Sequence, residues 1–145
     1  MMHKIMLTII LLFNIVLPVT AGPLDDAKAR THLAAVASGD LDALMQDYAA
    51  DAYMDWVGGP LDGRYYGASA IREVWKKFIA ANDGKPRASK LIKLESYANP
   101  KGASIEAYAT YDGKPSVQVL HVLTYRDGIL TTELWQISPK PAVTP

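Results

Sequence analysis

The second half of the chain consists of four consecutive segments typical of β-strands, separated only by short turns. These segments are 90–98, 103–112, 116–126 and 129–138. Their linkers contain Asn-Pro-Lys-Gly, Asp-Gly-Lys-Pro and Arg-Asp-Gly, which are turn sequences. Turns this short join antiparallel neighbours. The pattern therefore predicts an antiparallel sheet, one face of which has to be covered by other parts of the chain.

The first half of the chain supplies helices for that cover. An alanine-rich segment at 25–37 ends at Ser-Gly, a frequent helix stop, and Asp40 is placed to cap a second helix. Apolar residues at 41, 44, 45, 48 and 49 predict the second helix, and those at 71, 74, 75, 78 and 79 predict a third over about 68–81. A short strand is expected at 53–57 and an irregular loop at 58–63. We therefore predict one α+β domain over 22–138, a cone-shaped curved antiparallel sheet wrapped around three N-terminal helices, with a pocket at the open end.

Composition excludes several classes of function. The chain has no cysteine, which rules out disulfides, thiolate nucleophiles and Cys-type zinc sites. Its 15 basic and 15 acidic residues balance, whereas nucleic-acid-binding domains usually carry a marked basic excess. The histidines and aspartates show no recognisable metal-ligand spacing. We therefore expect no metal, no cofactor and no nucleic-acid partner.

Residues 1–21 have the layout of a secretory signal peptide. His3 and Lys4 precede an apolar run at 5–17, and Val-Thr-Ala at 19–21 provides small residues for cleavage after Ala21. The run is shorter than the roughly 20 residues that span a bilayer, so an uncleaved anchor is less favoured. We expect a periplasmic or secreted protein without membrane attachment after cleavage. Residues 139–145 contain three prolines and are expected to form a loose Pro-rich tail.

Short sequences at three element boundaries are informative about the family. Ser-Gly-Asp-Leu-Asp at 38–42 lies between the first helices, Tyr-Ala-Ala-Asp-Ala at 48–52 precedes the first strand, and Gly-Ala-Ser-Ala-Ile-Arg-Glu at 67–73 opens the third helix. In this order they resemble the nuclear transport factor 2-like superfamily, and within it the SnoaL-like and ketosteroid-isomerase-like proteins. The resemblance covers nearly all of the chain after the signal peptide. It implies the cone fold and frequent dimers, but the superfamily hosts isomerases, dehydratases, cyclases and binding modules, so it does not choose among functions.

Three side chains are candidates for acid–base chemistry. Alternation along 116–126 places His121 on the apolar face, where it is either a proton-transfer group or a hydrogen-bonded core residue. His32 lies on the first helix, where it is either an acid–base group or a histidine on the surface or in the helix hairpin. Asp55 is an acid inside an apolar strand, which suits a general base; strict alternation, however, places it opposite Met54 and Trp56 unless a bulge changes the parity.

The resemblance adds roles for these positions. In the ketosteroid isomerases a tyrosine, a general base and a protonated aspartate stand at about the positions of His32, Trp56 and His121. The replacements speak against steroid-type isomerisation. A histidine and an aspartate are similar to what dehydratase-type members use in the cone.

We expect the cone to bind a small, largely apolar molecule in a cavity of about 300 Å³ or more. The predicted lining residues are Tyr48, Trp56, Trp75, Val119, Leu123, Tyr125 and Trp135. Three functions remain open. The first is a cofactor-free lyase or isomerase (an isomerase, dehydratase or cyclase) with His121 and either Asp55 or His32 as its acid–base pair. The second is a non-catalytic ligand-binding protein, and the third is a module that forms a homodimer through the outer face of the sheet.

Overall fold

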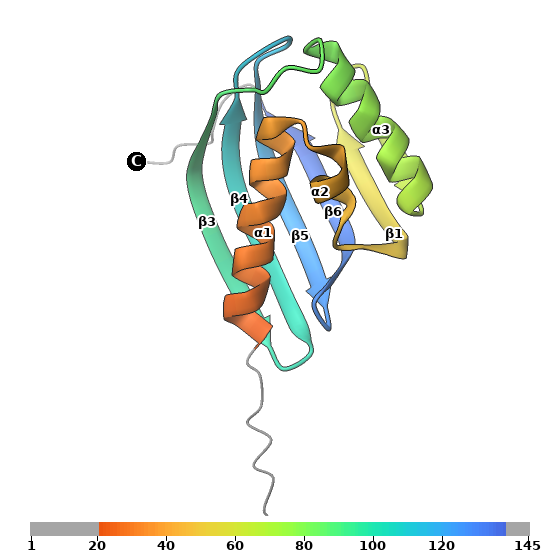
Figure 1. The fold of residues 1–145 in the computed structure, drawn as a ribbon. Helices are drawn as coiled ribbons and strands as arrows, with labels where there is room; N and C mark the ends of the chain where they lie inside the picture. The colour runs from red at the N-terminus through yellow and green to blue at the C-terminus, as the bar shows by residue number, and fades with distance from the viewer. Residues whose placement is uncertain (1–20, 139–145) are drawn as a thin grey trace, which may run out of the picture.

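A computed structural model describes residues 21–138, which form a six-stranded sheet covered on one face by helices (Figure 1). The helices are α1 (Ala21–Ser38), α2 (Leu41–Met45) and α3 (Ala68–Ala81). The strands are β1 (Tyr48–Val57), β2 (Gly63–Tyr66), β3 (Ser89–Asn99), β4 (Gly102–Tyr111), β5 (Val117–Arg126) and β6 (Ile129–Ile137). Residues 1–20 of the expected signal peptide and the expected tail at 139–145 lie outside the described residues. Within the described range no helix is both long and apolar enough to cross a membrane.

The strand order is β2-β1-β6-β5-β4-β3. The hairpins β3–β4, β4–β5 and β5–β6 are antiparallel, as their short turns predict. β1 joins β6 in parallel and β2 in antiparallel orientation. Helix α1 packs on β3 and β4, and α3 packs on β1 and β2 (Figure 1). The α+β fold with a curved sheet around N-terminal helices is thus confirmed.

Two local expectations were wrong. The second helix ends at Met45 and β1 already begins at Tyr48, five residues before the expected strand start. The N–H of Leu130 donates to the carbonyl of Asp47 at 2.7 Å. The segment after Met45 therefore pairs with β6 as a strand instead of extending the second helix. β2 was not predicted at all, because its four residues carry no alternation long enough to identify a strand.

Aromatic side chains fill the space between the sheet and α3. Trp56 stacks on Trp135 with ring centroids 4.7 Å apart, and Trp75 meets Trp135 edge-on at 4.9 Å. Phe78 also contacts Trp135, at 5.2 Å. All four rings are buried. Pairs of this kind contribute about 0.5–1.5 kcal/mol each beyond area burial, so this part of the cone is a packed core.

A buried arginine joins the C-terminal end of α3 to the β4–β5 turn. The guanidinium of Arg87 donates to the carbonyls of Pro115 at 2.6 Å, Lys114 at 2.9 Å and Phe78 at 3.3 Å. It also lies 4.3 Å from the ring centroid of Phe78. Burial lowers the pKa of Arg87. A Cβ at Gly113 would come within 2.7 Å of its Nη1, so the turn passes too close to the guanidinium for a larger residue.

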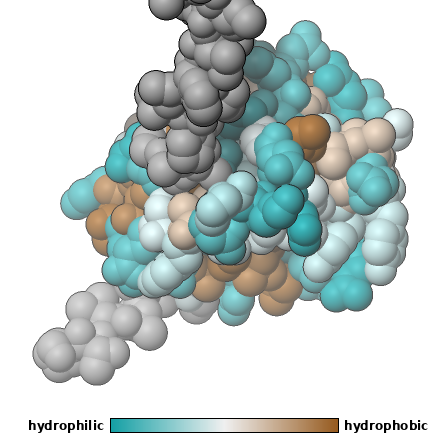
Figure 2. Space-filling model, turned by 90° about the horizontal axis from the view of Figure 1, so that it is seen from below, coloured by the Kyte–Doolittle hydropathy of each residue, from teal (hydrophilic) through white to brown (hydrophobic). Residues whose placement is uncertain are grey.

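Viewed from the end where α1 begins, the surface is mixed. Hydrophobic residues form separate patches among hydrophilic ones (Figure 2).

Candidate functional site

The described interior contains a buried carboxylate that is held by two histidines. Glu133 points inward from β6 and is 1% exposed. Nε2 of His32, on α1, lies 3.2 Å from both of its oxygens. Nδ1 of His121, on β5, lies 3.4 Å from Oε1, a long hydrogen bond. The hydroxyl of Tyr48, on β1, donates to Oε2. Side chains from three other elements, α1, β1 and β5, therefore converge on the carboxylate that β6 carries.

Two further hydrogen bonds extend this cluster. The hydroxyl of Tyr111, on β4, lies 3.0 Å from Nε2 of His121. The indole N–H of Trp75, on α3, donates to the hydroxyl of Tyr48 at 3.1 Å. We call these residues the Glu133 cluster: His32, Tyr48, Trp75, Tyr111, His121 and Glu133.

The electrostatics of the cluster keep Glu133 ionised. Burial alone would raise the pKa of Glu133, but its interactions with His32 and His121 outweigh burial and hold that pKa at about 2. The pKa of His121 is lowered, chiefly because the ring is buried and despite the opposing influence of Glu133. Burial and the carboxylate charge both raise the pKa of Tyr48 and Tyr111, so these two hydroxyls remain protonated. The cluster at neutral pH combines a carboxylate with neutral hydroxyl donors.

These protonation states define the tautomer of His121. An ionised carboxylate only accepts hydrogen bonds, so Nδ1 of His121 carries the proton and donates to Glu133. A neutral imidazole with a proton on Nδ1 has a lone pair on Nε2. The hydroxyl of Tyr111 donates to that lone pair. His121 is therefore arranged as a base at Nε2, with Glu133 behind it to stabilise the imidazolium that forms when it takes a proton.

Two of the three predicted acid–base residues meet in this cluster. Odd-numbered side chains of β5 are buried, as alternation predicts, and His121 is 0% exposed. His32 is also buried and faces the same carboxylate. Asp55 does not join them, because it lies on the opposite face of β1 from Trp56 and its carboxylate accepts from Arg64 at 2.6 and 2.9 Å. The expectation that Asp55 works with His121 is corrected by this geometry.

Sequence reasoning missed Glu133, the centre of the cluster. The signal was present, because period-two alternation along β6 places Glu133 on the same side as Trp135. An acid on the apolar face of a strand is unusual and needs a partner. The partners come from residues about 100 and 12 positions earlier in the chain, His32 and His121.

The predicted pocket residues point inward but pack against each other. Trp56, Trp75 and Trp135 form the aromatic core, and the others are buried around them. A cleft of about 240 Å³ lies instead between α1 and the strands β3 and β4, smaller than expected. Its lining is Arg30, Leu33, Ala34, Ser89, Leu91, Ala109 and Tyr111. Tyr111 is thus shared between the cleft and the Glu133 cluster.

The described residues hold no group of three His, Cys, Asp or Glu side chains placed to bind a metal ion. Two buried polar atoms near the cluster, Nε1 of Trp135 and the hydroxyl of Tyr125, lack a hydrogen-bond partner within the described part of the chain. An unpaired buried donor costs about 1–3 kcal/mol. The interior therefore keeps polar groups that a bound molecule could satisfy.

The N-terminal helices on a curved sheet form the nuclear transport factor 2-like fold. A family model described as SnoaL-like domain matches residues 29–133, and the chain belongs to that family. No curated protein matches the chain.

Solved structures support the fold. A nuclear transport factor 2-like protein of unknown function from Pseudomonas putida is 18% identical, with 83% of this chain and 88% of that chain covered and a TM-score of 0.66. A protein from Kribbella flavida is 20% identical, with 79% and 87% covered and a TM-score of 0.62. A protein with a cystatin-like fold from Nostoc punctiforme is 15% identical, with 82% and 92% covered and a TM-score of 0.62. Identities this low show the fold alone.

Proposed function

We propose that this chain binds a small, largely apolar molecule in the cleft between α1 and β3–β4 and transfers a proton on it without a cofactor. The observation that carries this proposal is the position of Tyr111, which lines the cleft and hydrogen-bonds the base nitrogen of His121 at 3.0 Å. The cleft supplies apolar side chains from Leu33, Leu91 and Ala109. Reactions of this type include isomerisation, dehydration and cyclisation, so the enzyme would be a lyase or an isomerase.

The cluster suggests a sequence of proton movements. Nε2 of His121 accepts a proton from a carbon next to a carbonyl or leaving group, and the electron pair of the broken C–H bond moves toward that group. Glu133 stabilises the imidazolium through the Nδ1 hydrogen bond. The hydroxyl of Tyr111 donates to the oxygen on which negative charge develops. The proton on Nε2 then returns to another carbon, to the oxygen or to the leaving group, which restores the neutral imidazole.

Access to His121 requires a movement of Tyr111. His121 is 0% exposed, and Tyr111 both lines the cleft and occupies Nε2 of His121 with its hydroxyl. Rotation of the Tyr111 side chain away from Nε2 would open a path from the cleft and bring its hydroxyl toward the bound molecule. Substrate entry and base exposure would then be one event.

A second candidate function is non-catalytic binding. The packed aromatic core favours it, because Trp135 of that core lies edge-on to the His121 ring at 4.8 Å and His121 is 0% exposed. In that case His121 and Tyr111 only orient the ligand.

One experiment separates the two functions. The purified protein is analysed by native mass spectrometry for a copurifying small molecule, which is then incubated with fresh protein in deuterium oxide. Leu33→Trp, which fills the cleft, should abolish copurification, and Ala27→Trp on the exposed side of α1 should not. Catalysis predicts that wild type incorporates deuterium into the ligand and that His121→Gln does not. A ligand without enzyme-dependent exchange supports binding alone, and a ligand retained equally by Leu33→Trp would place it elsewhere and refute the cleft.

Export and dimer formation are further parts of this proposal. The signal-peptide pattern at 1–21 supports a periplasmic or secreted location, and N-terminal sequencing of the protein recovered outside the cytoplasm should begin at Gly22. The partly exposed apolar side chains Leu120 and Val122 on the outer face of β5 support a homodimer. Light scattering should show a dimer that Leu120→Glu or Val122→Glu converts to a monomer.

A further inference from the structure

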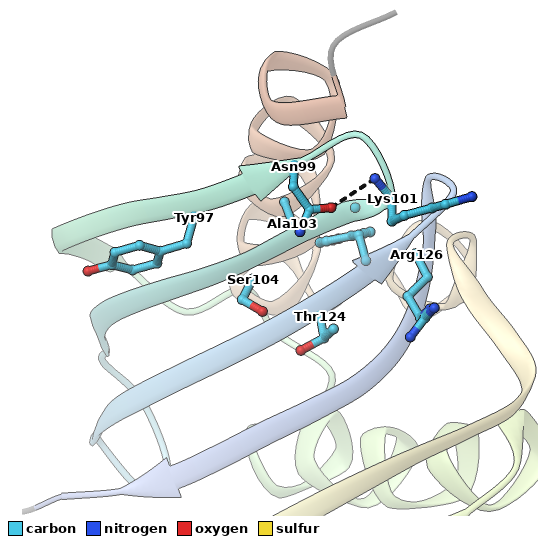
Figure 3. A pocket seen from close by; sticks show the side chains of 9 residues that line it. Tyr97, Asn99, Lys101, Ala103, Ser104, Thr124 and Arg126 are labelled. Atoms are coloured by element: carbon cyan, nitrogen blue, oxygen red, sulfur yellow. Dashed lines mark hydrogen bonds between the residues drawn. The ribbon is translucent and has the colours of Figure 1, made fainter.

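A hollow of about 320 Å³ lies on the face of the sheet turned away from α1, close to the β3–β4 turn (Figure 3). Cross-strand register builds its floor. Tyr97 on β3 lies opposite Ser104 on β4, which in turn lies opposite Thr124 on β5. Directly opposed residues project from the same face of a sheet. Figure 3 shows the hydroxyls of Ser104 and Thr124 side by side. The floor therefore carries two hydroxyls next to an aromatic ring.

The next row of the sheet contains a glycine. Gly102 lies between Asn99 and Arg126 in this row. A Cβ on Gly102 would come within 2.0 Å of the carbonyl oxygen of Tyr125, so the close approach of the backbone requires glycine. The side-chain oxygen of Asn99 accepts from the backbone N–H of Lys101 at 2.8 Å, which leaves the amide NH₂ as its donor group. Donors therefore border the hollow on this side.

The charges around the hollow are not balanced locally. Arg126 and Lys101 line it, and neither forms a salt bridge with any residue in the range 21–138. Of the acids around it, Glu95 and Glu106 both pair with Lys93, at 3.1 and 3.5 Å. Asp127, whose backbone N–H donates to the carbonyl of Lys101, stands next to Arg126 without a salt bridge in the range 21–138, so two cations face one acid at this end of the hollow. The hollow is therefore suited to a ligand that brings a negative charge.

The aromatic side chain is held in place for contact. Tyr97 is 62% exposed, yet its hydroxyl donates to Glu95 at 2.9 Å, which limits rotation of the ring. A fixed, exposed ring offers an apolar surface at low entropic cost. The Ser104 and Thr124 hydroxyls and the Asn99 amide offer hydrogen bonds beside it.

We propose that this hollow binds a single sugar unit that carries one anionic group, either a sugar acid or a sugar phosphate. The C–H face of the sugar ring packs on Tyr97, its hydroxyls bond to Ser104 and Thr124, and Arg126 binds the anion. The site lies on the opposite face of the sheet from the α1 cleft, so it is independent of the catalysis proposed above.

Amide NMR spectra of the protein test the proposal with four probes: glucuronate, glucose-6-phosphate, glucose and inorganic phosphate. At least one of the two anionic sugars should shift the backbone signals of Ser104 and Thr124, and which one does so identifies the anion. Glucose and inorganic phosphate should each bind with an affinity lower by about tenfold or more, because glucose lacks the anion and phosphate lacks the sugar ring. No binding of either anionic sugar at tens of millimolar would refute the proposal, and so would equal binding of glucose.

Variants at the exposed Arg126 and the half-buried Thr124 locate the binding. Arg126→Gln should lower the affinity for the anionic sugar by about tenfold or more, and Thr124→Val should lower that affinity several-fold. The matched control is Lys77→Gln, which removes an exposed positive charge on α3, outside the hollow. Equal weakening by Arg126→Gln and Lys77→Gln would show non-specific attraction to positive charge and would overturn the assigned site.

Discussion

Replacement of Glu133 by glutamine is the most direct test of the buried cluster. Glutamine keeps the shape of the side chain but turns one acceptor oxygen into an NH₂ donor. His32, His121 and Tyr48 all donate to this carboxylate, so at least one of these donors then faces another donor. Loss of a buried acceptor costs about 1–3 kcal/mol. The change therefore affects stability even if the protein has no enzymatic activity.

The lowered pKa of Glu133 gives a second estimate of the stability that this carboxylate contributes. The pKa of Glu133 is 4.5 for the unperturbed side chain and about 2 in the folded protein. A tenfold change in proton affinity is worth about 1.4 kcal/mol, so this difference contributes about 3 kcal/mol of stability at neutral pH. Together the two estimates place the loss of unfolding free energy for Glu133→Gln at about 1–3 kcal/mol.

The direction of the pH dependence follows from the lowered pKa values. The folded pKa of Glu133 lies below the unfolded value, so its contribution is complete above pH 4.5 and is lost as the pH falls toward about 2. The folded pKa of His121 is also lowered, so the unfolded state binds its proton first as the pH falls below 6.5. Both groups make the wild type less stable in acid. Glu133→Gln should remove the part of this decline that lies below pH 4.5.

Urea unfolding followed by tryptophan fluorescence measures the effect at pH 7 and at pH 4. The matched control is Glu73→Gln, because Glu73 is an exposed acid that pairs with Lys76 at 3.0 Å on α3. Such surface pairs contribute about 0–1 kcal/mol. A Glu133→Gln variant as stable as the control at pH 7, with an unchanged acid profile, would show that Glu133 is not an ionised partner of the histidines.

Three further substitutions have defined outcomes. Tyr111→Phe removes the donor to Nε2 of His121 and should lower the unfolding free energy by about 1 kcal/mol in urea titrations; an increase in stability would contradict the assigned hydrogen bond. Gly113→Ala places a Cβ within 2.7 Å of Arg87 and should lower the melting temperature by several degrees, corresponding to about 1–3 kcal/mol, and an unchanged melting temperature would argue against that close contact. Asp55→Asn on the outer face should leave ligand exchange unchanged and stability within about 0.5 kcal/mol, whereas loss of exchange would return Asp55 to the active site.

The sequence was sufficient for the fold because its strongest patterns are local. The stripe that includes Ile71, Trp75 and Phe78 predicted α3 with the bounds that the structure has. The turn sequences separated the last four strands to within one residue or so at each end. Alternation on β5 also placed His121 inside correctly. These features depend on spacing within one element.

The errors arise where distant segments decide the structure. The residues from Tyr48 onward have helical spacing, yet they pair with β6 about 80 residues later, and tertiary pairing prevailed over local periodicity. Local alternation placed Glu133 on the face of Trp135, but its partner His32 is 101 residues away, so the cluster itself could not be predicted from spacing. Spacing also shows which side chains face inward, but it does not show that Trp56, Trp75 and Trp135 pack against each other in the space they share.

The position of β6 also bears on how the chain reaches this structure. Among the strands of residues 21–138, β6 comes last in the chain, yet it lies in the interior of the sheet between β1 and β5. It contributes both Trp135 and Glu133, so neither the aromatic core nor the polar cluster can assemble before it. Pairing of β1 with β6 closes a loop of most of the domain, a slow step in folding. The native core should therefore not form until β6 has left the ribosome, and truncation within β6 should abolish folding rather than remove an edge strand.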